Sequence, residues 1–357
     1  MNRRKVVVDA MGGDDAPGVI IDGAAQAFKE SKDIFLMLVG NPEIIAPLAE
    51  KAQLPADRYE IVAAMDSIGM EESPREALHS KPDASINVAA RLIRDGAGDA
   101  LLSAGSTGAT VLACSDYIPR VPGVERGVLA AVLPANKSQK TDPGRSIMLD
   151  VGATLHCTAN QLVSFAIMGI NYARDVMEID NPRVGLVNIG EEETKGHGEL
   201  VEANRLLRGL EGVNFVGNIE GKDIIKGVAD VIVTEGYIGN VLLKGLEGFA
   251  DATVETGKRI YGKNIRSKLG LFMLSPIIKK LKKRFDYAEV GGAPILGFRK
   301  LIIKAHGRSN AKAIKNAMLL AEKAAGRNLA AHMEAQMKTF YMGMFDGGKG
   351  DGKASSE

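Results

Sequence analysis

Short apolar runs alternate with longer segments of helical pattern from one end of the chain to the other. The apolar runs predict buried strands at residues 5–10, 34–40, 59–64, 99–105, 127–133, 146–152, 183–190, 230–236 and 300–307. Segments with helical length and composition lie between them and include 84–95, 158–174, 197–209, 237–257 and 309–325. Repeated strand–helix–strand units favour a mostly parallel sheet with helices on both faces, so we expect a three-layer α/β/α fold.

The chain shows no linker and no internal repeat, so the pattern predicts one α/β/α domain over residues 1–345. The last residues, 346–357, are small and polar and predict a disordered tail. Several of the predicted strands end in glycine. In open α/β sheets ligands bind beyond the carboxyl ends of the strands, so these glycine-rich exits are where chemistry is expected.

Composition narrows the functional classes. The chain has 357 residues with 45 Lys and Arg against 44 Asp and Glu, a balance that argues against a nucleic-acid-binding protein. Cys114 and Cys157 are isolated, which supports neither a disulfide framework nor a zinc site and favours the reducing cytoplasm. The N-terminus lacks the apolar stretch of a signal peptide, and no segment approaches the roughly 20 apolar residues of a membrane span.

One segment departs from this charge balance. Residues 258–284 contain ten Lys and Arg and no Asp or Glu. Within and just after this window, apolar residues recur at helical spacing, which predicts a basic amphipathic helix in a protruding segment at about 258–290. The residues of its apolar face are Leu274, Ile277, Ile278, Leu281 and Phe285.

The glycine-rich exits match neither the P-loop nor the GxGxxG fingerprint, so an ATPase or an ordinary dinucleotide site is not supported. In DALLSAGSTGATVLA a strand runs through Ser103 into Ser106 and Thr107 and then into a helix, which offers hydroxyls and N–H groups to an anion. The segment VTEGYIGNVLLKG offers the same arrangement at Gly236 and Asn240. The alternative for both is that glycine serves only a tight connection.

Seven motifs in order carry a resemblance to a known family: VVVDAMGGDDAPGVIIDGA, SAGSTGA, LDVGA, NIGEEETKG, GNIEGKDI, TEGYIGNVLLKGLEG and GGAPILGFRKLIIKAHG. Over roughly residues 4–325 the chain resembles the bacterial acyl-acyl carrier protein:phosphate acyltransferases, the PlsX family. It departs from the family pattern at Ser106, Thr154 and Glu235, where Asn, Asn and Asp are more usual.

The resemblance implies a homodimeric enzyme of phospholipid synthesis that reversibly moves a fatty acyl group from acyl carrier protein to inorganic phosphate. It implies a fold similar to the isocitrate and isopropylmalate dehydrogenases and to the phosphotransacetylases. It also implies a cytoplasmic protein bound peripherally to the anionic inner face of the membrane, with a membrane-bound glycerol-3-phosphate acyltransferase as a further candidate partner. We expect no cofactor, metal or nucleic acid.

A thioester carbonyl is already electrophilic and its thiol is a good leaving group, so this reaction needs an oriented phosphate and a stabilised oxyanion rather than a nucleophile triad. We expect Lys195 to hold the attacking phosphate; the alternative is an exposed lysine paired with Glu191, Glu192 and Glu193. His306 could donate to the acyl oxyanion or protonate the thiolate, or be purely structural. Asn188 ends a buried strand and is the third catalytic candidate, with a core hydrogen bond as its alternative.

The candidate substrate-binding residues share a position at or near the strand exits. At the first exit carboxylates would repel phosphate unless a cation intervenes, and they could instead cap the helix from Pro17. The glycine pair before the last strand suggests an entrance for the acyl chain. The full set is Asp9, Gly12, Gly13, Ser103, Ser106, Thr107, Asp150, Glu235, Gly236, Asn240, Gly291 and Gly292.

Three other functions stay open at this point. A phosphotransacetylase that uses coenzyme A would share the fold and the acyl phosphate chemistry. A hydroxyacid dehydrogenase could use the same architecture without the usual dinucleotide fingerprint. A membrane-binding scaffold without activity would explain the basic helix but not the glycine-rich strand exits.

Overall fold

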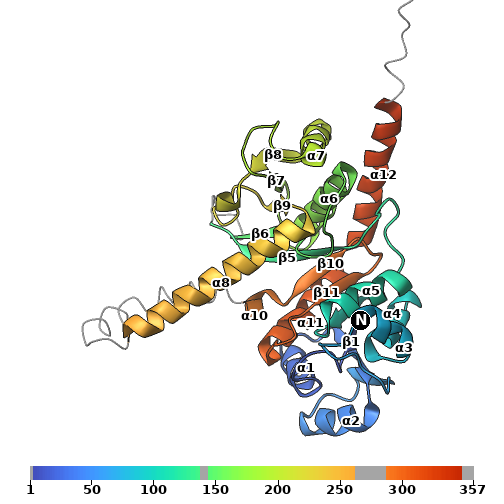
Figure 1. The fold of residues 1–357 in the computed structure, drawn as a ribbon. Helices are drawn as coiled ribbons and strands as arrows, with labels where there is room; N and C mark the ends of the chain where they lie inside the picture. Colours follow the sequence, from blue (N-terminus) through green and yellow to red (C-terminus); the bar gives the residue numbers. More distant parts are fainter. Residues whose placement is uncertain (1–2, 137–143, 262–286, 348–357) are drawn as a thin grey trace, which may run out of the picture.

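The computed structural model describes residues 3–136, 144–261 and 287–347. Within these residues it contains one 11-stranded sheet in the order β3-β2-β1-β4-β11-β10-β5-β6-β9-β7-β8 (Figure 1). The strands are β1 (Arg4–Asp9), β2 (Ile34–Gly40), β3 (Tyr59–Ala63), β4 (Ala100–Ser103), β5 (Val128–Pro134), β6 (Arg145–Leu149), β7 (Arg183–Val187), β8 (Asn214–Ile219), β9 (Val231–Val233), β10 (Ala293–Leu296) and β11 (Leu301–Lys304).

Helices cover both faces of this sheet, as predicted. They are α1 (Gly18–Glu30), α2 (Pro42–Lys51), α3 (Pro74–Ser80), α4 (Ser85–Arg94), α5 (Thr107–Tyr117), α6 (Ala159–Asp175), α7 (Gly198–Gly209), α8 (Gly236–Tyr261), α10 (Tyr287–Val290), α11 (Ala311–Ala325) and α12 (Leu329–Gly347). Apolar residues of α1, α2, α6, α7, α11 and α12 form one core, and α3, α4 and α5 pack on the opposite face over the first half of the sheet.

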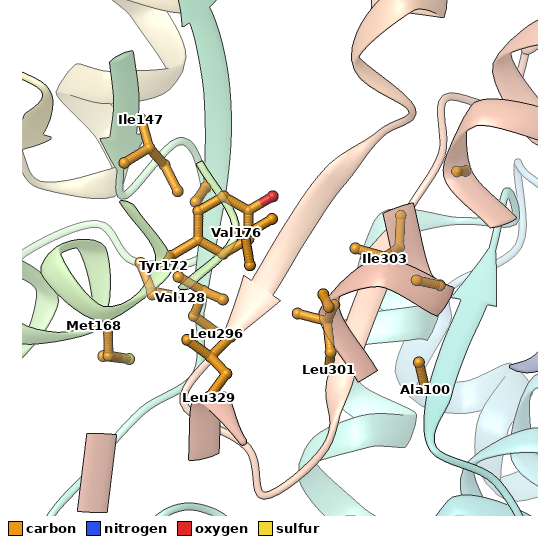
Figure 2. Close-up of a cluster of buried hydrophobic side chains, with 14 of the residues drawn as sticks. Ala100, Val128, Ile147, Met168, Tyr172, Val176, Leu296, Leu301, Ile303 and Leu329 are labelled. Carbon is orange, nitrogen blue, oxygen red and sulfur yellow. The ribbon is translucent and has the colours of Figure 1, made fainter. Parts of the chain in front are cut away.

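The main core spans both halves of the sheet. Figure 2 shows Leu301 and Ile303 of β11 and Leu296 of β10 in the same cluster as Tyr172 of α6 and Leu329 of α12. Tyr172 is 1% exposed. Burying a large apolar side chain of this kind stabilises a fold by roughly 1.5–3 kcal/mol, so the N-terminal and C-terminal strands are held together by shared packing.

The strands form two parallel groups that run in opposite directions. β10 is antiparallel to both β11 and β5, and β5 is antiparallel to β6. The carboxyl ends of β1, β4 and β11 therefore point opposite to those of β6, β7 and β9. Helix α8, which leaves β9, packs Leu242, Leu243 and Leu246 against the second half of the sheet.

The predicted elements do not include β8, β10, α2, α3 or α12. β8 has Gly217 at φ +96°, and its register with β7 shifts between Val184 and Gly185, which breaks the apolar run. β10 is four residues long, follows two glycines and contains Pro294, so its local sequence resembles a turn.

Two predicted segments lie largely outside the described residues. These are most of the basic segment, including its whole apolar face, and residues 348–357 of the predicted tail, whereas α12 continues to Gly347. Among the helices that the structure describes, none is both long enough and apolar enough to cross a bilayer.

Candidate active site

Three polar side chains form one row across neighbouring parallel strands. Asp9 of β1 lies opposite Ser103 of β4, and Ser103 lies opposite Lys304 of β11. Asp9 Oδ1 accepts a hydrogen bond from Ser85 Oγ at 2.6 Å, and Oδ2 accepts one from Ser103 Oγ at 2.7 Å. All four side chains are buried, and burial raises the pKa of Asp9 and lowers the pKa of Lys304 to about 8. Asp9 and Ser103 therefore face into the protein, and the hydrogen bond between them links the ends of β1 and β4.

The first two exits pack directly on each other. A Cβ at Gly12 would lie 2.5 Å from Asp9 Oδ2 and 2.7 Å from the backbone nitrogen of Gly105, so only glycine fits there. Gly13 follows at φ +117°. The cavity lined by Asp9, Gly12, Ser85 and Ser106 has a volume of about 10 Å³. That volume holds about one water molecule, so phosphate would bind outside it.

The N-terminus of α5 presents polar groups beside this closed cavity. Ser106 occupies the N-cap position, but its side chain makes no capping hydrogen bond. Thr107 is exposed at the first position of the helix. The first N–H groups of a helix have no partner within the helix and attract anions. Ser106 and Thr107 are thus better placed to contact an anion than Asp9 or Ser103.

The exits of β6 and β9 form a second polar cluster. Asp150 accepts hydrogen bonds from the backbone N–H groups of Gly152, Ala153 and Thr154 at 3.0, 2.9 and 2.8 Å. Burial raises the pKa of Asp150, while these donors act in the opposite direction. The Asp150 carboxylate therefore accepts hydrogen bonds from its own loop, residues 150–154, and stabilises the conformation of that loop.

Glu235 and Gly236 join this cluster to α8. Glu235 Oε1 accepts from the backbone N–H of Cys157 at 3.0 Å, and its Oε2 lies 3.2 Å from His197 Nε2. The N–H of Gly236 donates to Thr154 Oγ1 at 3.2 Å. One turn later, Asn240 is exposed and its side chain lies against Gly152, so it faces the β6 exit.

The β7 exit carries two of the predicted catalytic residues. Asn188 Nδ2 donates to the carbonyl oxygen of Lys195 at 2.8 Å, and Asn188 Oδ1 accepts from the N–H of Ile189 at 2.8 Å. Asn188 thus shapes the loop that carries Lys195. The Lys195 side chain is exposed, and within the described part of the chain no carboxylate lies at ion-pair distance from it, whereas Glu193 pairs with Arg208 at 2.9 Å.

The β11 exit carries His306, whose surroundings are cationic. The N–H of Arg308 donates to His306 Nδ1 at 3.2 Å, which leaves the proton of the neutral ring on Nε2. Burial lowers the pKa of His306, and the positive charges of Lys304 and Lys244 lower it further. Lys244 lies on α8, four residues after Asn240, so one helix face connects the β6 exit with the β11 exit.

Gly291 and Gly292 approach the protein's own backbone. They have φ values of +85° and +106°. A Cβ at Gly291 would lie 2.6 Å from the carbonyl carbon of Asn316, and one at Gly292 would lie 2.9 Å from the Lys304 carbonyl oxygen. These glycines therefore pack the start of β10 against α11 and β11.

Neither cysteine is suited to nucleophilic catalysis. Both are buried, and burial raises the pKa of Cys157 to about 11 and that of Cys114 further. Over the described ranges, no group of three or more His, Cys, Asp or Glu side chains is arranged to hold a metal ion.

Lys304 and Arg308 are parts of this site that were not predicted from the sequence. The signal was present, because a lysine ends the apolar strand LIIK and is followed directly by AHGR. A charged side chain at the end of an otherwise apolar strand is seldom buried without a partner or a function.

Comparisons with known proteins bear on both fold and family. The family model described as "Fatty acid synthesis protein" matches residues 4–332. A phosphate acyltransferase from Heliobacterium modesticaldum is 44% identical over 331 residues, which cover 92% of this chain and 96% of that protein. A phosphate acyltransferase from Thermosynechococcus vestitus is 41% identical over 336 residues, which cover 94% and 96%.

Two solved structures share the fold. A phosphotransacetylase from Streptococcus pyogenes matches with a TM-score of 0.61 at 17% identity, covering 90% of this chain and 94% of that one. A branched-chain phosphotransacylase from Enterococcus faecalis matches with a TM-score of 0.57 at 15% identity, covering 91% and 99%. These likenesses confirm the predicted α/β/α fold of phosphotransacetylase type. The family model and the sequence matches show that the chain belongs to the fatty acid synthesis protein family, in which the similar relatives named above are phosphate acyltransferases.

Proposed function

We propose that this protein transfers a fatty acyl group from acyl carrier protein to inorganic phosphate and forms acyl phosphate reversibly. The observation that carries the proposal is the match to phosphate acyltransferases along nearly the whole of both chains. A phosphate oxygen attacks the thioester carbonyl carbon, the carbon–sulfur bond breaks, and the thiolate takes up a proton. Because the thiol has an ordinary pKa near 8.5, it leaves without strong acid catalysis.

The site offers groups for the two requirements of this reaction, which are an oriented phosphate and a stabilised oxyanion. The N-terminus of α5, with Ser106 and Thr107, supplies N–H groups and hydroxyls that would orient phosphate. His306 would supply its Nε2 proton as a hydrogen bond to the developing oxyanion, and Lys244 and Arg308 would keep its surroundings positive. The buried cysteines support direct attack by phosphate rather than a covalent acyl-enzyme.

The decisive experiment mixes the purified protein with palmitoyl-acyl carrier protein and inorganic phosphate. We expect phosphate-dependent loss of the thioester and an acyl phosphate that hydroxylamine traps as the hydroxamate. Parallel reactions with acetyl-coenzyme A and phosphate, and with NAD and a hydroxyacid, test the other two enzymatic functions. Turnover of acetyl-coenzyme A but not of the carrier-bound substrate would make the protein a phosphotransacetylase.

Lys195→Ala is expected to lower turnover by at least about tenfold, about 1.4 kcal/mol in transition-state terms, without loss of folding. The exposed ammonium would hold phosphate as a point charge and makes no ion pair within the described residues. Steady-state kinetics at saturating phosphate measures the change, and Lys51→Ala on the exposed face of α2 is the matched control. Wild-type turnover in Lys195→Ala would show that this lysine is only part of the surface.

We further propose that the protein is a cytoplasmic homodimer bound peripherally to the inner face of the membrane. Its carrier substrate and a membrane-bound glycerol-3-phosphate acyltransferase are the proposed partners. The second half of α8 extends away from the sheet (Figure 1) and exposes apolar side chains, among them Phe249 at 74% and Tyr261 at 52%. Such a surface on a soluble domain is typical of an interaction site and supports contact with a second subunit or a lipid surface.

Replacing Ile277, Leu281 and Phe285 with Asp is expected to abolish sedimentation with anionic vesicles. These residues lie outside the described residues, and the prediction rests on the sequence pattern, in which ten nearby cations attract anionic lipid and the apolar face inserts. The dimer and turnover in solution should be largely unchanged. A monomeric variant would place this face between subunits, and vesicle binding that survives both the variant and high salt would exclude the membrane role.

A further inference from the structure

Lys304 is a buried cation without a neighbouring carboxylate. It is 6% exposed at the end of β11. Its Nζ donates to the carbonyl oxygen of Ala305, and no carboxylate of the described residues lies within ion-pair distance of it. Asp9 and Asp14 act on Lys304 only over a longer range. A buried ammonium that is not locally neutralised acts strongly on neighbouring groups because the interior screens charge poorly.

The peptide that Lys304 contacts leads directly to His306. Three backbone hydrogen bonds fix this exit loop: Ala305 N–H donates to Ser103 O at 2.9 Å, Asp14 N–H donates to Gly307 O at 3.0 Å, and Ser309 N–H donates to His306 O at 2.9 Å. Backbone hydrogen bonds thus tie the exit loop to β4 and to the loop after β1, and one further bond closes it within itself. Within the described residues, Lys304 adds a side-chain hydrogen bond to the Ala305 carbonyl oxygen.

The other charges around His306 are already partly neutralised. Lys244 pairs with Glu247 at 2.7 Å on α8, and Arg308 lies 3.9 Å from Asp14. Within the described residues, Lys304 on β11, Arg308 in the exit loop and Lys244 and Glu247 on α8 are charged groups that act on His306. Of the cations among them, Lys304 alone lacks an ion-pair partner within the described residues.

We propose that Lys304 is a positioning residue for His306, whose buried ammonium fixes the preceding peptide and keeps a second positive charge off the imidazole ring. His306 then stays a neutral ring with its proton on Nε2. The inference rests on the proposed function for the role of His306 in turnover, but the coupling between the two side chains does not. The proposal assigns a role to the buried row Asp9–Ser103–Lys304, because its last member positions His306.

The test is an NMR titration of the histidine Cε1 protons in wild-type protein and in Lys304→Met. The chain has five histidines, and His306→Ala assigns the relevant signal. Removing the charge is expected to raise the pKa of His306 by about 0.5–1 unit, and the acidic limb of the kcat profile should move up by the same amount. Lys304→Arg, which keeps the charge, and Lys300→Met, one residue before β11, should leave the titration within about 0.2 unit of wild type.

Lys304→Met leaves Asp9 buried without its distant cation and can lower the stability of the fold. The double variant Asp9→Asn/Lys304→Met removes both charges and should fold with the same rise in the pKa of His306. An unchanged His306 titration in either folded variant would overturn the proposal. If the titration shifts as expected but His306→Ala keeps wild-type turnover, the coupling stands and the proposed role of His306 in the reaction fails.

Discussion

His306→Ala should lower kcat by about 100-fold while leaving the KM for phosphate nearly unchanged. A single hydrogen-bond donor to a developing oxyanion is worth about 10²–10³ in turnover, because the bond strengthens only as charge builds on the oxygen. His306 is partly exposed at the β11 exit, and Arg308 N–H donates to its Nδ1, so the proton of the neutral ring lies on Nε2. Steady-state kinetics with carrier-bound substrate measures both constants.

The pH dependence of kcat in the wild-type protein tests the protonation state of His306. Burial and neighbouring cations hold the pKa of His306 below its ordinary value of 6.5. Activity that needs the neutral ring is therefore full at pH 7 and is lost only as the pH falls through that lowered pKa. His332→Ala, on α12 and paired with Asp175 at 2.8 Å, is the matched control and should keep wild-type turnover. A rise in activity toward low pH would instead indicate that the imidazolium acts as a general acid.

Most of the layered sheet was accessible from the sequence because many of its strands are short, largely buried and mainly apolar. β1, β2 and β6 have this character; β2 lies at its predicted bounds, and β1 and β6 lie within three residues of theirs. β8 and β10 were not, because a glycine bulge and a proline remove the apolar signal. β10 also pairs with β5, which is distant in sequence, and no local pattern contains that pairing.

The side-chain roles at the site depend on three-dimensional contacts in the same way. The sequence places Asp9 and Asp150 at strand exits, but only the structure shows that their carboxylates are occupied by Ser85, Ser103 and backbone N–H groups. The reverse holds for Lys304, whose burial follows from strand register and not from its neighbours in sequence. Polarity at a strand exit therefore predicts a site but not which of its groups face the ligand.

Gly239→Ala is expected to destabilise the protein by more than about 3 kcal/mol, the upper range for forcing extra volume into a packed interior. A Cβ at Gly239 would lie 1.8 Å from the carbonyl oxygen of Asp150, and the obstacle is backbone that cannot rotate away. Either the first turn of α8 or the 150–154 loop must move. Because Asn240 and Lys244 follow on the same helix, that movement would also displace the groups that face the two strand exits.

Urea unfolding followed by circular dichroism measures the loss of stability, and turnover of the surviving folded fraction measures the displacement. Gly209→Ala at the end of α7 is the matched control, because nothing lies within 4 Å of a Cβ there. That variant should be neutral or slightly more stable, since alanine favours the helix over glycine by up to about 1 kcal/mol. Equal stability of the two variants would show that α8 can shift freely at its origin, and the close packing of α8 on the β6 exit would then have no part in holding the site together.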